Sequence, residues 1–200
     1  MSVKLFVEGG AKGPLSTKCR AGFASFLQQA GFAGHMPKVF SCGSRQEAYN
    51  DFCTAIGNDE KAILLVDSES SVSAAADKAK PWLHVQSRAG DGWARPAGVA
   101  DDQLHFMVIC MEAWFLTDKE ALSSYFGQNF NVNALSKRND IELISKSDIY
   151  LGLSQATKNT KKGEYGKGKH SFEILAQIDP EKVRRASPYA DRFLNTLNHL

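Results

Sequence analysis

Four short apolar segments stand out in the first 111 residues. They are residues 3–7, 38–42, 62–66 and 104–111. Runs this short that are rich in Val, Ile, Leu and Phe and bounded by polar residues are typical of strands buried on both faces. Between the first three runs, apolar residues recur at helical spacing. The first 70 residues therefore predict the order β-α-β-α-β.

This order predicts an α/β fold with a doubly wound, mainly parallel sheet and helices on both faces. Ser44, followed three positions later by Glu47, is a capping-box pattern that predicts a helix start. A short helix is expected at 74–80 within an otherwise irregular stretch. After residue 116 the chain becomes more polar and mainly helical. We expect one domain, with a core of about 1–116 and a helical, basic-loop extension of about 117–200.

Three of the four predicted strands end at acidic residues. The acids are Glu8, then Asp67 with Glu69 two positions on, and then Glu112. Because parallel strands bring their carboxyl ends to one edge of an α/β sheet, these carboxylates are expected to converge there. Clustered like charges cost free energy unless a cation or protons neutralise them, and carboxylate oxygens suit Mg²⁺. The pattern predicts a divalent-cation site, although each acid alone also fits a solvated strand end.

The most basic stretch is 158–170, which holds five lysines, three glycines and one glutamate. It predicts a flexible basic loop with two open interpretations. Such a loop either neutralises a nucleic-acid backbone and places a lysine at the scissile phosphate, or is simply solvated. The candidate residues are Lys161, Lys162, Lys167, Lys169 and His170.

Two other stretches offer weaker candidates. The glycine-rich turn 9–13 before a helix can hold phosphate with backbone amides, with Lys12 and Arg20 nearby, but it lacks the Gly-Lys-Ser/Thr order of a Walker loop. In the irregular segment 70–103, Arg88 and Trp93 suit phosphates and bases. The alternative is that the tryptophan only pins this segment to the core.

Composition narrows the class of protein. The formal net charge of +2, from 24 basic and 22 acidic residues, does not identify a nucleic-acid binder by itself. We expect a cytoplasmic protein without membrane contact, since no signal peptide and no run of eighteen apolar residues is present. The four cysteines lack C-x-x-C spacing, so we expect reduced core thiols rather than a zinc site or disulfides.

The motifs V-E-G-G, L-L-V-D-S-E, M-E-A-W-F-L-T-D and K-G-K-H-S-F together resemble a prokaryotic Toprim-like family of small proteins of unknown function, distantly related to the Toprim domains of OLD-type nucleases. The resemblance implies a Toprim-like fold in which Glu8, Asp67 and Glu69 hold Mg²⁺ or Mn²⁺. Two departures matter: Glu69 stands where Toprim domains have Asp, and 11–12 is Ala-Lys where OLD-type nucleases carry another acid. Glu112 is the candidate replacement, and one firmly held ion is expected rather than two.

The function expected from motifs and resemblance together is that of a Mg²⁺- or Mn²⁺-dependent nuclease. Glu8 would take the proton from the attacking water, Lys167 would stabilise the phosphorane charge, and His170 would protonate the leaving group. The nucleic acid, DNA or RNA, would be contacted by Lys12, Arg20, Arg88, Trp93, Lys161, Lys162 and Lys169.

The resemblance also implies an ATPase protein partner and a role in defence against phage or plasmids, and it leaves a homo-oligomer open. Two alternatives remain from other classes. One is a non-catalytic Toprim-like binding or regulatory subunit. The other is a small nucleotide-binding phosphotransferase that uses the 9–13 loop.

Overall fold

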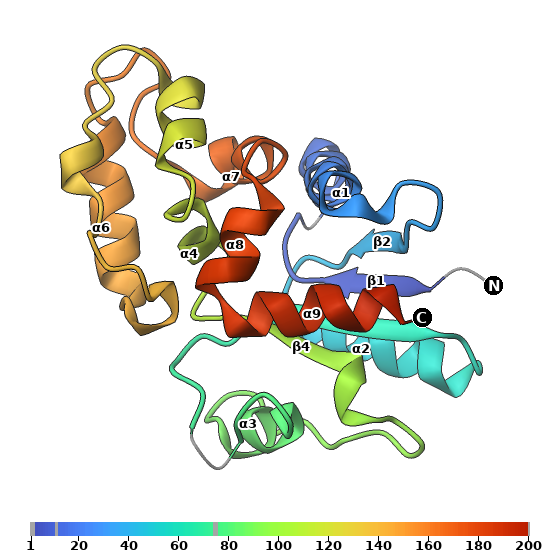
Figure 1. Cartoon of the computed structure of the whole chain (residues 1–200). Helices are drawn as coiled ribbons and strands as arrows, with labels where there is room; N and C mark the ends of the chain where they lie inside the picture. Colours follow the sequence, from blue (N-terminus) through green and yellow to red (C-terminus); the bar gives the residue numbers. More distant parts are fainter. Residues whose placement is uncertain (1–2, 11, 74–75, 200) are drawn as a thin grey trace.

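A computed structural model describes residues 3–10, 12–73 and 76–199 of the chain. Its centre is one four-stranded sheet with the strand order β2-β1-β3-β4, and all neighbouring strands are parallel (Figure 1). The strands are β1 (Lys4–Val7), β2 (Lys38–Ser41), β3 (Ala62–Asp67) and β4 (Leu104–Met107). The predicted α/β fold with a parallel sheet is confirmed.

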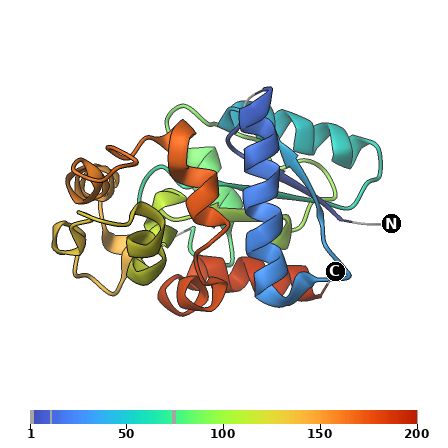
Figure 2. The ribbon, with the colours of Figure 1, turned by 90° about the horizontal axis from the view of Figure 1, so that it is seen from above.

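Helices cover both faces of this sheet (Figures 1 and 2). Helix α1 (Pro14–Leu27) packs on one face, and α2 (Arg45–Gly57) and α3 (Pro81–Ser87) pack on the other. Successive side chains of β3 alternate between the two faces of the sheet. Ile63 and Leu65 join the hydrophobic cluster under α1, while Leu64 and Val66 join the cluster under α2 and α3. Every residue of β3 is buried, as expected for a central strand.

Of the helix starts predicted from the sequence, the one at Ser44 is confirmed and the one at residue 74 is not. The Ser44 side chain accepts from the Glu47 N–H and the Glu47 carboxylate accepts from the Ser44 N–H, which confirms the capping box. The helix expected at 74–80 is wrong. Residues 74 and 75 lie outside the described residues, 76–79 form a turn, and α3 begins only at Pro81, whose fixed φ suits a first helical turn.

The second half of the chain is mainly helical. It contains α4 (Glu112–Phe115), α5 (Lys119–Phe126), α6 (Lys146–Thr157), α7 (Lys167–Leu175), α8 (Pro180–Ala186) and α9 (Pro188–Asn198), with a 3₁₀ turn, Asp101–Gln103, before β4 and two more, Val132–Ala134 and Ile141–Leu143, before α6. Helix α7 packs against α1, and α9 lies along β4. Trp114, Phe172 and Phe193 share one hydrophobic cluster with Leu5 of β1, so the expected extension adds to the core of the sheet.

Two predicted boundaries are corrected. The strand expected over 104–111 ends at Met107, because the chain then turns and its Met107 and Ile109 carbonyls accept hydrogen bonds from the Ser68 and Glu69 N–H groups. Glu112 therefore begins α4 instead of ending a strand.

The basic loop expected over 158–170 is also shorter than predicted. Its last four residues, 167–170, form the first turn of α7. Among the described residues, the four cysteines are free thiols. Cys19 and Cys110 are buried as expected of core thiols, whereas Cys42 and Cys53 are only half-buried. Within the same ranges, none of the helices combines the length and apolar character needed to cross a bilayer.

Candidate metal centre

Three carboxylates that are far apart in sequence meet at the carboxyl edge of the sheet. One oxygen from each of Glu8, Asp67 and Glu69 lies within 4.8 Å of the other two. The register of the sheet explains this meeting, because β1 and β3 are parallel neighbours with Val7 opposite Leu65. Glu8 directly follows β1 and Asp67 is the last residue of β3, so both side chains emerge at the same edge.

Backbone hydrogen bonds hold each acid in place. The Asp67 Oδ1 accepts from the Met111 N–H at 2.8 Å, and the Glu8 Oε2 accepts from the Asp67 N–H at 3.2 Å. Glu69 has a left-handed backbone with φ of 66°, which is costly for a residue with a side chain. Its N–H donates to the Ile109 carbonyl at 2.9 Å, which stabilises the turn that returns its carboxylate to Asp67.

Three basic residues surround these acids. The Lys146 Nζ lies 2.6 Å from the Glu69 Oε2, and the Lys167 Nζ lies 3.5 Å from the Asp67 Oδ2. Arg45 donates to the Asp67 carbonyl and forms a two-point ion pair with Asp91.

Sequence reasoning did not identify Lys146 or Arg45. Each is the first residue of a helix, after a serine cap. A helix start of this kind is visible in the sequence. Which edge of the sheet it faces depends on the tertiary packing.

Burial sets the charge state of the acids. It raises the pKa of Asp67, and the neighbouring Glu8 charge raises that pKa further, while Lys167 opposes both. Burial likewise raises the pKa of Glu8 against the opposing charges of Lys167 and Arg45. Burial disfavours the charged form of Lys167, but Asp67, Glu112 and Glu8 outweigh it and raise the Lys167 pKa. The acids are thus costly as anions, and added positive charge stabilises them.

Glu112, the fourth predicted ligand, lies behind this group. Its side chain is fully buried, and the Tyr165 hydroxyl donates to its Oε1 at 3.0 Å. Its Oε2 has no hydrogen-bond partner within the described part of the chain. Glu112 is outside the set of three converging acids, although its charge contributes to the raised pKa of Asp67.

Of the predicted substrate-binding residues, some are exposed and others are already bound to other protein groups. Lys12 is exposed before the start of α1, and Arg20 is exposed in the middle of that helix. Arg88 is bound to Asp91 at 2.9 Å. Trp93 is buried, stacks on Tyr49 and donates to Gln46, so it anchors the irregular segment to the core, which is the alternative raised above.

His170 is separated from the three acids. Its ring packs against Tyr125, Phe126 and Tyr165, and its Nδ1 accepts from the Gly166 N–H at 3.0 Å. It lines a different pocket together with the predicted lysines Lys161, Lys162 and Lys169. The structure therefore groups His170 with the basic side chains, and of the predicted cationic residues only Lys167 contacts the acid group directly.

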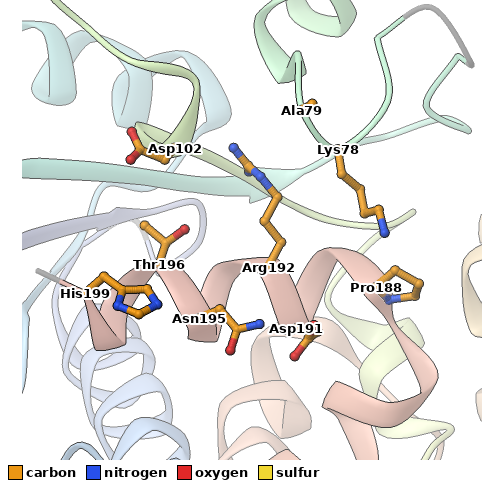
Figure 3. Close-up of a pocket in the computed structure, with 9 residues that line it drawn as sticks. All are labelled: Lys78, Ala79, Asp102, Pro188, Asp191, Arg192, Asn195, Thr196 and His199. Carbon is orange, nitrogen blue, oxygen red and sulfur yellow. The ribbon is translucent and has the colours of Figure 1, made fainter.

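Another pocket, of about 510 Å³, lies between α9 and the segment before α3 (Figure 3). Its lining residues are Lys78, Ala79, Asp102, Pro188, Asp191, Arg192, Asn195, Thr196 and His199. Arg192 donates hydrogen bonds to the Leu104 and Asp101 carbonyls and to the His105 ring, and Asp191 forms an ion pair with Arg184. These bonds favour a structural role for the two charged groups.

The comparisons with known proteins gave one match. A family model described as "Domain of unknown function (DUF4276)" matches residues 11–198. No curated protein and no solved structure matches the chain. The matched range contains Asp67, Glu69, Lys146 and Lys167, whereas Glu8 lies three residues before it.

Proposed function

We propose that this chain, which belongs to the DUF4276 family of domains of unknown function, is a nuclease that hydrolyses phosphodiester bonds with a bound Mg²⁺ or Mn²⁺ ion. The observation that carries the proposal is the meeting of Glu8, Asp67 and Glu69 within 4.8 Å. Two lysines reach the same place from the second half of the chain. The link to Toprim and OLD-type proteins rests on the sequence motifs alone.

The three acids fit a hard divalent cation. Oxygens around an octahedral ion at about 2.1 Å lie about 3 to 4.2 Å from one another. The observed spread of up to 4.8 Å therefore needs only a small contraction of these side chains. All three donors are carboxylate oxygens, the ligand type that Mg²⁺ and Mn²⁺ prefer. The residues present thus fit the ion that the proposal requires.

When bound, the ion would lower the pKa of a coordinated water and polarise the phosphate. Glu8 is half-buried at this edge, and its raised pKa suits it to accept the proton of the attacking water. Lys167 keeps 43% of its side chain exposed while it contacts Asp67, so its ammonium group can also meet a phosphate oxygen from solvent. Its raised pKa keeps this group charged at neutral pH.

A second candidate function has one observation in its favour. Lys146 and Lys167 already pair with Glu69 and Asp67, so part of the acidic charge is neutralised without an ion. This favours a non-catalytic binding or regulatory subunit as the alternative. The phosphotransferase has less support, since the Gly9 N–H in the glycine-rich turn is bound to the Gly43 carbonyl. The ATPase partner and the defence role rest on the resemblance.

Cleavage assays separate the nuclease from the non-catalytic subunit. Supercoiled plasmid and a structured RNA are incubated with Mn²⁺ and the wild type, Glu8→Gln or Glu60→Gln. Glu60 pairs with Lys4 at the opposite end of the sheet and serves as the matched control. We expect cleavage by the wild type and the control, and a rate at least about 100-fold lower for Glu8→Gln. Equal cleavage by all three proteins, or none by any, contradicts the nuclease proposal.

A further inference from the structure

A cationic pocket of about 420 Å³ lies beside α7 and is separate from the three acids. It is lined by Lys18 of α1, Tyr125 of α5, Lys161 and Lys162 of the connection between α6 and α7, and Lys169, His170 and Glu173 of α7. Four of these residues are lysines and one is an acid. The Glu173 carboxylate forms an ion pair with Lys18 at 2.7 Å and accepts a hydrogen bond from the Tyr125 hydroxyl, so its charge is compensated by Lys18 and not by the other three lysines.

Three lysines of the pocket have no acidic partner among the described residues. The Lys169 Nζ donates to the Lys162 carbonyl at 2.7 Å, and the Lys162 Nζ lies 4.4 Å from the centre of the Tyr125 ring. Within the described residues, neither of these lysines nor Lys161 forms an ion pair. A concave surface with three uncompensated cations attracts a polyanion, and the repeated phosphates of nucleic acid are the polyanion best matched to it.

His170 adds an unused hydrogen-bond donor to this pocket. Its Nδ1 accepts from the Gly166 N–H, and burial together with the Lys169 charge lowers its pKa, while the nearby Lys162 carbonyl opposes this shift. The neutral ring therefore carries its proton on Nε2. The residue is only 2% exposed, and its Nε2 has no hydrogen-bond partner among the described residues. Buried donors are rarely left without an acceptor, and a phosphate oxygen is a suitable one.

The position of the pocket relative to the acids follows from helix geometry. Lys167 contacts Asp67, and Lys169 lies two positions later in the same helix. At 3.6 residues per turn, these two side chains leave nearly opposite sides of α7. A helix with its side chains is about 10–12 Å wide.

We infer that this pocket is a phosphate-binding subsite for a nucleic-acid backbone, separate from the place where a phosphate would meet Lys167. The His170 Nε2–H donates to a phosphate oxygen, and Lys161, Lys162 and Lys169 neutralise the charge. The inference rests on the proposed function for its second phosphate, at the metal centre. Binding in the pocket itself needs no metal ion.

Fluorescence anisotropy with a labelled 20-nucleotide single strand in EDTA tests the lysines. The wild type is compared with Lys161→Glu/Lys162→Glu, and with Lys38→Glu/Lys61→Glu as a control of equal charge change at the amino ends of β2 and β3. We expect the pocket variant to bind at least about tenfold more weakly and its salt slope to fall by about 1.4. The control should change affinity less than about threefold. Equal losses in the two variants, or no binding by the wild type, overturn the inference.

Substitutions of His170 test the donor. Asn in this position keeps an acceptor for the Gly166 N–H but its shorter NH2 group does not reach the place of Nε2, whereas Gln keeps a donor close to that place. We expect His170→Asn to lose affinity about five- to tenfold and His170→Gln to retain it, with similar melting temperatures. Wild-type affinity in both variants contradicts the role of His170. If either fails to fold, the lysine pair decides the inference.

The two proposals fail in different ways. Intact binding in EDTA without any Mn²⁺-dependent cleavage contradicts the nuclease and leaves the subsite supported. Unchanged binding and cleavage by the lysine variant contradict the subsite and leave the nuclease standing. Equal competition by a poly-glutamate peptide in the binding assay would assign the surface to an acidic protein and overturn the inference.

Discussion

The Asp67 N–H donates a hydrogen bond to the Glu8 Oε2 at 3.2 Å, across 59 positions of the sequence. The bond exists because β1 and β3 are parallel neighbours in fixed register. It connects the Glu8 carboxylate directly to β3, the strand that carries Asp67. The arrangement of the acids therefore depends on β1 and β3, whose residues are almost all buried.

Asp67→Asn should remove most of the affinity for Mn²⁺. Asparagine keeps an oxygen for the Met111 N–H but lacks the second carboxylate oxygen and the negative charge. We expect an affinity lower by more than about 100-fold, since loss of outer partners alone typically costs 10–100-fold. Isothermal titration calorimetry measures it, with Glu60→Gln as the control. Similar affinities in the wild type and Asp67→Asn would exclude Asp67 as a ligand.

Lys146→Met should strengthen Mn²⁺ binding. The Lys146 ammonium occupies the Glu69 carboxylate, so a cation has to compete with it. Its removal should raise the affinity a few-fold and lower the free energy of unfolding by about 1 kcal/mol or less, since both side chains are partly exposed. Lys4→Met, which breaks the similarly exposed pair with Glu60, is the control for the stability change alone. Weaker Mn²⁺ binding by Lys146→Met would show that this lysine supports the site.

Tyr165→Phe should destabilise the protein through Glu112. The hydroxyl of Tyr165 donates to a fully buried carboxylate whose other oxygen has no hydrogen-bond partner among the described residues. We expect a loss of about 1–3 kcal/mol in urea denaturation. Tyr125→Phe removes a similar bond to the more exposed Glu173, where water can replace the hydroxyl, and should cost less than about 1 kcal/mol. Equal losses would mean that burial of the acid is not the cause.

Acid should destabilise the fold through His105. Burial and the adjacent Arg192 lower the pKa of this fully buried histidine to about 3. Below about pH 6.5 the unfolded chain gains a proton there while the folded protein does not. The free energy of unfolding should then fall by up to about 1.4 kcal/mol per pH unit until the pH reaches the folded pKa.

Denaturant titrations between pH 7 and 4 measure this dependence, with His105→Gln as the comparison. The variant cannot bind this proton, so its stability should vary less with pH by about that slope. Parallel pH dependences in the two proteins would assign the acid sensitivity to other groups.

The central strand and the acid positions could be predicted because local patterns determine them. Residues 62–66 have no polar position, which fits a strand covered on both faces, and Asp67 follows at its end. The end of the strand within the apolar run 104–111 could not be predicted. The strand and the turn after it are both buried, so the hydrophobic pattern does not mark the boundary at Met107. The pattern therefore predicts Glu112 at the end of a strand, whereas it begins α4.

The basic partners could not be predicted because they depend on long-range packing. Lys146 and Lys167 lie 77 and 100 positions from the acids they contact. The glycines around Lys167 also concealed the start of α7, so that His170 was assigned to a loop near the acids instead of to a buried position in a helix.

In a crystal soaked in Mn²⁺, the anomalous signal of the ion shows where it binds. We expect a peak about 2.1 Å from carboxylate oxygens of Glu8 and Asp67, with Glu69 close by or bridged through water. A peak elsewhere in the molecule, or none at this edge of the sheet, would contradict the proposed metal centre.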